Sequence, residues 1–61
     1  MITAERAIDI IKITENLNKD HWDAHLRQQM TKSEISDLNQ LEYLYGTSST
    51  YVILSNIIWN S

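Results

Sequence analysis

The chain has 61 residues and a formal net charge of −3, with two histidines, one glycine, and neither cysteine nor proline. This composition excludes disulfides, thiolate zinc sites and cysteine nucleophiles, and a domain this short buries only about 60% of the surface its unfolded chain exposes. Without the turn residues of a sandwich or barrel, residues 1–61 are predicted to form a single all-α domain.

The first predicted helix runs from about Ala4 to Asn16, with Thr3 as its N-cap. Its apolar residues form a broad stripe at helical spacing, made of Ala4, Ala7, Ile8, Ile10, Ile11, Ile13 and Leu17. The helix is predicted to end near Asn18, because asparagine can adopt the left-handed conformation of a C-cap.

A second, short helix is predicted to follow, with Asp20 as its N-cap. Its apolar residues Trp22, Leu26 and Met30 recur at intervals of four, which indicates a narrow buried line. We expect Trp22 to close one side of the core.

The start of a third helix is marked by a capping box at Thr31 and Glu34. In this motif the threonine accepts from the amide three residues on, and the glutamate accepts from the amide of the threonine. The helix then carries apolar residues on one side, namely Ile35, Leu38, Leu41 and Tyr45. It is predicted to end at Gly46, which can take a left-handed conformation without steric cost.

The segment from Tyr51 to Trp59 gives conflicting signals, because its β-branched and aromatic residues also favour a strand. A helix is preferred, since a lone strand would have no pairing partner and the apolar residues form a continuous helical stripe. The expected architecture is a small bundle of three to four short helices. Its predicted aliphatic core consists of Ile8, Ile11, Ile35, Leu38, Leu41, Leu54 and Ile58.

Two histidines, His21 and His25, stand one helical turn apart, a spacing at which a helix can chelate a metal. A catalytic zinc needs a third protein ligand, and no residue stands at a spacing that marks one. Glycine-rich phosphate loops are absent, and a chain this short gives little room for a catalytic pocket with an oxyanion hole. We therefore expect a non-enzymatic protein without metal or cofactor, in which the two histidines are solvated.

The stretch from Leu38 to Ile57 resembles a helix-turn-helix motif. Leu41, Gly46 and Val52 stand where the motif has the apolar residue of its first helix, its turn glycine and a core residue of its second helix. This resemblance implies a DNA-binding regulator, which is the alternative hypothesis for function.

Two features depart from that motif. Glu42 stands at a position that is usually small and apolar, and Ser55 replaces an aliphatic core residue. Residues 33–61 also contain three acids and neither lysine nor arginine, so the would-be recognition helix has no cation for phosphates or bases. The charge pattern therefore argues against nucleic acid as a partner.

If the last segment is a helix, Val52 and Trp59 fall on the side opposite its core stripe, one i to i+7 step apart. Tryptophan and tyrosine dominate the hot spots of protein interfaces, so this helix is predicted to bind a partner, with Tyr43 and Trp22 as further candidates. The predicted function is a protein-binding inhibitor or adaptor. Its partner is another protein or a second copy in a homodimer, and a structural subunit of a larger assembly is a further alternative.

The N-terminal segment has Glu5 and no long apolar run, which does not fit a secretory signal. The apolar cluster of residues 51–59 is far shorter than the roughly 20 residues that span a bilayer, so we expect a cytoplasmic protein without membrane contact. Nine isoleucines and five asparagines are typical of AT-rich genomes, such as those of phages and mobile elements. Small proteins from such genomes often target host machinery, which favours the inhibitor hypothesis.

Overall fold

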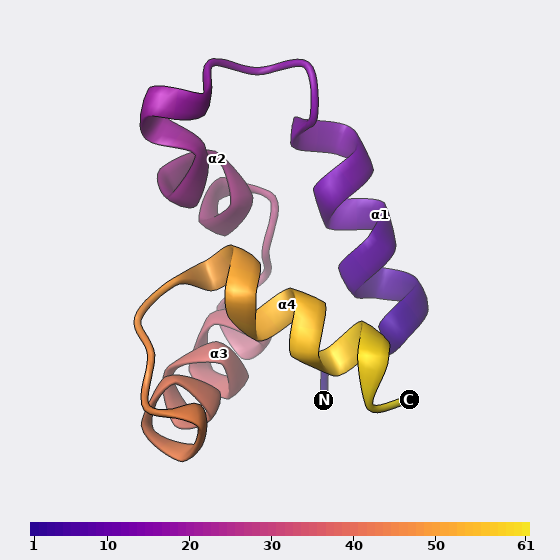
Figure 1. Ribbon diagram of the computed structural model, residues 1–61, viewed down its shortest axis with the longest axis vertical. Coiled ribbons are helices and arrows are strands. Elements are labelled where there is room, and N and C mark those ends of the chain that lie inside the picture. The colour runs from indigo at the N-terminus through magenta and orange to yellow at the C-terminus, as the bar shows by residue number, and fades with distance from the viewer.

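The computed structural model describes residues 1–61 as four α-helices and one short 3₁₀ helix (Figure 1). The elements are α1 (Ala4–Thr14), η1 (Lys19–His21), α2 (Trp22–Gln28), α3 (Lys32–Tyr45) and α4 (Thr50–Trp59). There is no strand, so the all-α prediction is confirmed, and the segment with conflicting signals forms helix α4. This last helix lies across the bundle, packing most extensively against α1 and also touching α2 and α3 (Figure 1).

The helix boundaries follow three of the predicted signals. Thr3 Oγ1 accepts from the backbone N–H of Arg6 at 3.1 Å and caps α1. Both hydrogen bonds of the capping box are present, with Thr31 Oγ1 3.1 Å from the Glu34 amide and Glu34 Oε1 2.9 Å from the Thr31 amide. Gly46 ends α3 with a φ of 69°. These local signals therefore fix both ends of α3.

The connection between α1 and α2 differs from the prediction. α1 already ends at Thr14, and no residue other than glycine has a positive φ, so Asn18 is not a left-handed C-cap. Instead Asn18 is extended, and its side-chain oxygen accepts from the amide of Asp20 at 2.9 Å. Asn18 is thus the N-cap of η1, and Asp20 lies inside η1. Asp20 therefore does not cap α2 as predicted. The N-cap of α2 is His21, whose side chain makes no capping hydrogen bond.

The set of buried residues also differs from the predicted core. The buried apolar side chains are Ile2, Ala7, Ile10, Leu26, Leu38, Ile53 and Leu54. Of the other predicted core residues, four are only half-buried, namely Ile11, Ile35, Leu41 and Ile58. Ile8 is 39% exposed and the prediction for it is wrong. Adjacent residues on a helix point about 100° apart, so burying Ala7 and Ile10 in the centre of the bundle turns Ile8 towards its edge.

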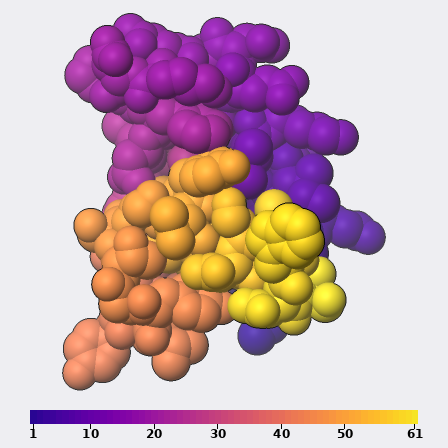
Figure 2. Space-filling model, viewed as in Figure 1, coloured from indigo at the N-terminus to yellow at the C-terminus, as the bar shows by residue number.

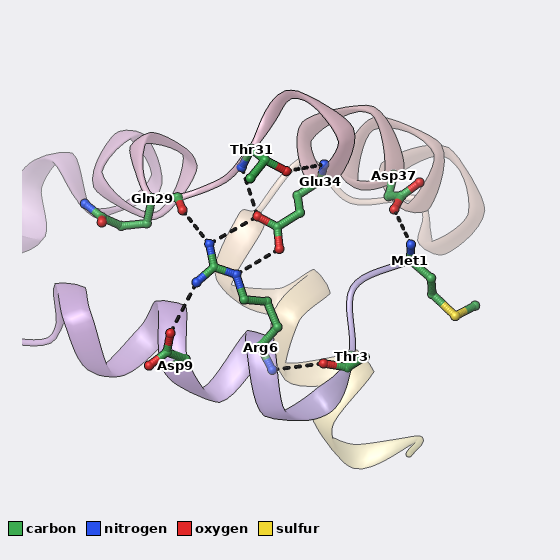
Figure 3. A network of polar contacts seen from close by, with 8 residues as sticks. All are labelled: Met1, Thr3, Arg6, Asp9, Gln29, Thr31, Glu34 and Asp37. Carbon is green, nitrogen blue, oxygen red and sulfur yellow. Dashed lines mark hydrogen bonds and ion pairs between the residues drawn. The ribbon is translucent and has the colours of Figure 1, made fainter.

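Arg6 on α1 joins three elements through its guanidinium (Figure 3). It donates to both carboxylate oxygens of Glu34, at 2.8 and 3.2 Å, and to the carbonyl of Gln29, the C-cap of α2, at 2.8 Å. A further hydrogen bond reaches Asp9 at 3.2 Å. Glu34 also accepts from the Thr31 amide. The carboxylate of Glu34 therefore both completes the N-terminal cap of α3 and binds α1 through Arg6.

These contacts change the acid–base properties of the pair. The hydrogen bond from Arg6 lowers the pKa of Glu34, and the Thr31 amide acts in the same direction against the opposing effect of partial burial. The hydrogen bond to Glu34 correspondingly raises the pKa of Arg6. The ion pair therefore favours both charged forms in the folded chain.

The first prediction concerns the cap of α3. Thr31→Ala should lower the free energy of unfolding by roughly 0.5 to 2 kcal/mol, because it removes the oxygen that accepts from the Glu34 amide. Urea denaturation measures the change. Thr31→Ser keeps that oxygen and should retain most of the stability, and an Ala variant with an unchanged midpoint would contradict the role of this cap.

The second prediction concerns pH. Because the pKa of Glu34 is lower in the folded chain than its ordinary value of 4.5, ionised Glu34 stabilises the fold above that pH. This contribution is lost as the pH falls through the folded-state pKa. Wild type should therefore be more stable than Glu34→Gln at pH 7, and the difference should shrink below about pH 4.5. Denaturation at several pH values tests this.

Glu15→Gln is the matched control for that series, since it removes an exposed carboxylate that forms no ion pair. It should change stability little at pH 7. A difference between wild type and Glu34→Gln that stays constant from pH 7 to about pH 3 would show that the ion pair does not stabilise the fold.

Candidate protein-interaction surface

A second arginine network holds the N-terminus of α4. Arg27 on α2 pairs with Asp23 at 3.1 Å and with Glu42 on α3, and its Nε also donates to Thr50 Oγ1 at 3.1 Å. Asp23 Oδ1 accepts from the backbone N–H of Thr50, the first residue of α4, at 2.8 Å. The first turn of α4 is therefore tied to both α2 and α3.

Asp23 is held in its ionised form by this arrangement. Partial burial acts to raise the pKa of Asp23, but the hydrogen bonds from Thr50 and the pairing with Arg27 together lower it below its ordinary value. A carboxylate that accepts from the N-terminus of a helix is also favourably placed with respect to the helix dipole. Asp23 is thus a long-range partner for the start of α4.

An aromatic pair fixes the flank of α4 that faces α2. The rings of Trp22 and Tyr51 lie 4.7 Å apart between centroids, with an interplanar angle of 32°. Trp22 Nε1 donates to the buried Thr14 Oγ1 at 3.0 Å, and Lys19 Nζ lies 4.0 Å from the Trp22 ring centroid. Trp22 packs against the core as predicted, so only part of this candidate interaction residue is open to solvent.

The opposite side of α4 points outward. The residues that α4 buries are Thr50, Ile53 and Leu54. Val52 is 42% exposed and Trp59 is 85% exposed, with Ser55 and Asn56 half-buried between them. We call these four residues the outer strip of α4. In Figure 2 the helix runs across the near face of the molecule from orange to yellow, beside the turn that precedes it.

The outer strip contains no charged residue, and the carboxylates of residues 33–61 are paired. Residues 33–61 hold three carboxylates, of which two accept from the arginines described above. The third belongs to Asp37, whose Oδ2 lies 2.9 Å from the amino group of Met1 (Figure 3). This contact is an ion pair by distance, although its direction does not complete a hydrogen bond. All three side-chain carboxylates of residues 33–61 are therefore paired, and the unpaired side-chain charge of α3 is that of Lys32 at its first residue.

Tyr43 lies apart from the outer strip. Its side chain is 93% exposed on α3 and lines a shallow, open cleft of about 370 Å³ together with residues of the following turn, from Gly46 to Ser48. No residue of α4 lines this cleft. Of the four sequence-predicted interaction residues, the structure thus brings together Val52 and Trp59, and leaves Tyr43 and Trp22 on separate surfaces.

Sequence reasoning missed an apolar groove at the end of the bundle where both termini lie (Figure 1). It has a volume of about 310 Å³, and its apolar lining includes Ile2, Leu41, Tyr45 and Ile57. A smaller hollow of about 200 Å³ adjoins it beside Leu44. The available signal was Leu44, an additional apolar residue near the apolar side of the predicted third helix, which is 72% exposed in the structure.

The helix-turn-helix packing is not reproduced. Val52 would belong to the core of that motif, but it is exposed. Glu42, at the motif's small apolar position, pairs with Arg27. Helix α4, which would be the recognition helix, carries no lysine or arginine. The turn at Gly46 is the feature that this structure shares with a helix-turn-helix motif.

The histidines occupy different elements, with His21 exposed at the end of η1 and His25 half-buried in α2. No cluster of three or more histidine, cysteine or acidic side chains has the geometry to hold a metal ion. No helix combines the length and apolar composition needed to cross a membrane.

Comparison with known proteins found no matching family model, no similar curated protein and no similar solved structure. The outer strip of α4 is therefore argued from its own geometry and chemistry.

The third prediction tests the two faces of α4. Trp59→Ala should change the free energy of unfolding by less than about 0.5 kcal/mol, because the side chain is 85% exposed. Leu54→Ala, on the buried face of the same helix, should cost about 2 to 5 kcal/mol. Urea denaturation measures both. If Trp59→Ala destabilised the chain as much as Leu54→Ala, the assignment of the outer face would be wrong.

Proposed function

We propose that this chain is a non-enzymatic protein-binding module that presents the outer strip of α4 to its partner. The observation that carries the proposal is the 85% exposure of Trp59 at the end of a helix without charged residues. Tryptophan is enriched in interface hot spots, and charged residues are depleted from interface cores. Both features agree with a binding surface.

The chemistry of the strip indicates the kind of protein surface that fits it. Trp59 would fill an apolar pocket, while Ser55 and Asn56 would form hydrogen bonds beside it. Because the strip itself has no charge, binding should depend little on ionic strength. A chain this small acts on such a partner by covering part of its surface, which is the mode of an inhibitor or an adaptor.

The fourth prediction tests this proposal by affinity capture from the source cells. Tagged wild type should retain a specific protein, and Trp59→Asp should weaken its capture at least fivefold, which corresponds to about 1 kcal/mol. Circular dichroism should show unchanged helicity and melting. Ser36→Asp adds the same charge at an exposed position on α3 and should capture the protein as wild type does.

Three outcomes would contradict the proposal. Capture that is equal in Trp59→Asp and wild type would place the interaction elsewhere, with Tyr43 the next residue to change. Retention of nucleic acid, lost as salt increases, would support the DNA-binding alternative. Unfolding of Trp59→Asp, with Trp59→Ala equally destabilised, would assign Trp59 to the core.

A further inference from the structure

The C-terminal part of the chain carries no charged side chain. Residues 43–61 contain no acid, lysine, arginine or histidine, and α4 within them contains neither glycine nor proline. Most residues of α4 are β-branched or aromatic, the types that favour strands. They are Thr50, Tyr51, Val52, Ile53, Ile57, Ile58 and Trp59. Short segments with strong strand preference, little charge and no proline are typical of cross-β assemblies.

Charge separates α4 from the other isoleucine-rich helix. α1 contains Ile8, Ile10 and Ile11, but Asp9 and Lys12 stand among them. Charges within an apolar segment oppose its self-assembly, because stacking identical strands would bring like charges together. Every helix of the bundle other than α4 contains such charges. α4 is therefore the one helix without this protection.

The helical form of α4 depends on contacts near its first residue. A helix of 10 residues is marginal by itself, since isolated helices shorter than about 12 to 15 residues are barely stable in water. Ser49 Oγ accepts from the Val52 N–H at 3.3 Å, and the Thr50 N–H donates to Asp23 at 2.8 Å. Arg27 donates to Thr50 Oγ1 at 3.1 Å. We call the hydrogen bonds of Thr50 with Asp23 and Arg27 the tether of α4.

The tether is the only polar link between α4 and the other helices. Beyond Thr50, the hydrogen bonds of α4 and of the two residues after it stay within residues 49–61. The remaining contacts are apolar, through the buried Ile53 and Leu54 and the Tyr51 ring beside α2. Apolar contacts are non-directional, so they favour burial of this segment without requiring that it be helical.

An extended form of this segment would be apolar on both sides. Side chains alternate between the two faces of a strand, which places Leu54 and Ile58 on one face and Ile53 and Ile57 on the other. When identical strands stack in register, each residue meets its own copy, and without charges no like-charge repulsion opposes this stacking. Asn56 would form an asparagine ladder, which adds to the stability of such an assembly.

We infer that the tether keeps a strand-forming segment helical, and that its release lets residues 50–59 of several copies assemble as cross-β structure. The inference goes beyond the proposed function, because it concerns the segment after α4 has left the bundle and not the surface of the folded helix. Release needs only a local opening, and such openings occur in folded proteins without global unfolding. Assembled chains no longer present Trp59 on a helix, so assembly and the proposed binding exclude one another.

The fifth prediction removes the tether from the full chain. Asp23→Ala takes away the acceptor of the Thr50 N–H and should raise the rate of assembly at least about fivefold, because α4 is released more often. Asp20→Ala is the matched control, since it removes an exposed carboxylate that forms no ion pair. It should assemble as slowly as wild type. Thioflavin T fluorescence at about 100 µM protein measures the rates.

The structure of the assemblies identifies the segment that forms them. Fibre diffraction should show the cross-β spacing of about 4.7 Å between strands. Protease digestion followed by mass spectrometry should find residues 50–59 in the resistant core. A core that consists of α1, a precipitate without the cross-β spacing, or an Asp23→Ala variant that assembles no faster than Asp20→Ala would each overturn the inference.

A second pair of variants tests the inference even if Asp23→Ala does not fold. Val52→Lys places a charge at an exposed position of α4, so it should leave the folded helix intact and oppose stacking of the extended segment. Ser36→Lys adds the same charge at an exposed position on α3. In about 2 M urea, Val52→Lys should assemble at least about tenfold more slowly than Ser36→Lys, with urea midpoints correcting for any difference in stability. Equal rates after this correction would show that α4 does not form the assembly.

Discussion

The arrangement of this small bundle depends on two arginines from its first half that neutralise carboxylates from its second half. Arg6 joins α1 to Glu34 on α3, and Arg27 joins α2 to Glu42 on α3 and to Thr50 on α4. Residues 33–61 contain no lysine or arginine, and their carboxylates are paired with Met1, Arg6 and Arg27 from the first half of the chain. With only seven buried apolar side chains, these polar bridges help to specify how the helices meet.

The polar contacts of Arg27 and Asp23 also determine which face of α4 is exposed to solvent. The first turn of the helix is fixed by Asp23 and Arg27, and the Trp22–Tyr51 pair fixes one flank. Ile53 and Leu54 then face the core, and Trp59 lies at the far end on the opposite side. The position of Trp59 is therefore set by contacts that do not involve it, and this agrees with the binding role proposed for it, since binding residues are best placed on rigid elements.

Local signals in the sequence predicted much of this. Helix ends are marked by contacts within a few residues, at Thr3, Thr31 and Gly46. Once residues 51–59 are taken as a helix, helical periodicity also predicts the exposure of Val52 and Trp59. The phase of α1 could not be predicted, since a broad apolar stripe allows either Ala7 or Ile8 to face inward. The arginine pairs join residues 15 to 28 positions apart, and neither periodicity nor spacing reveals such pairs.

Exposed apolar residues alone do not distinguish α4, because small domains leave many of them at the surface. Ile13 and Leu17 are also exposed near the end of α1, but Lys12 and Glu15 stand among them. An approaching surface would have to desolvate those charges, at a cost that opposes the gain from apolar burial. The outer strip of α4 imposes no such cost, since its polar members are a serine and an asparagine, whose hydrogen bonds an approaching surface can replace. The absence of charge in the outer strip, together with the exposure of Trp59, is therefore the observation on which the proposed binding surface depends.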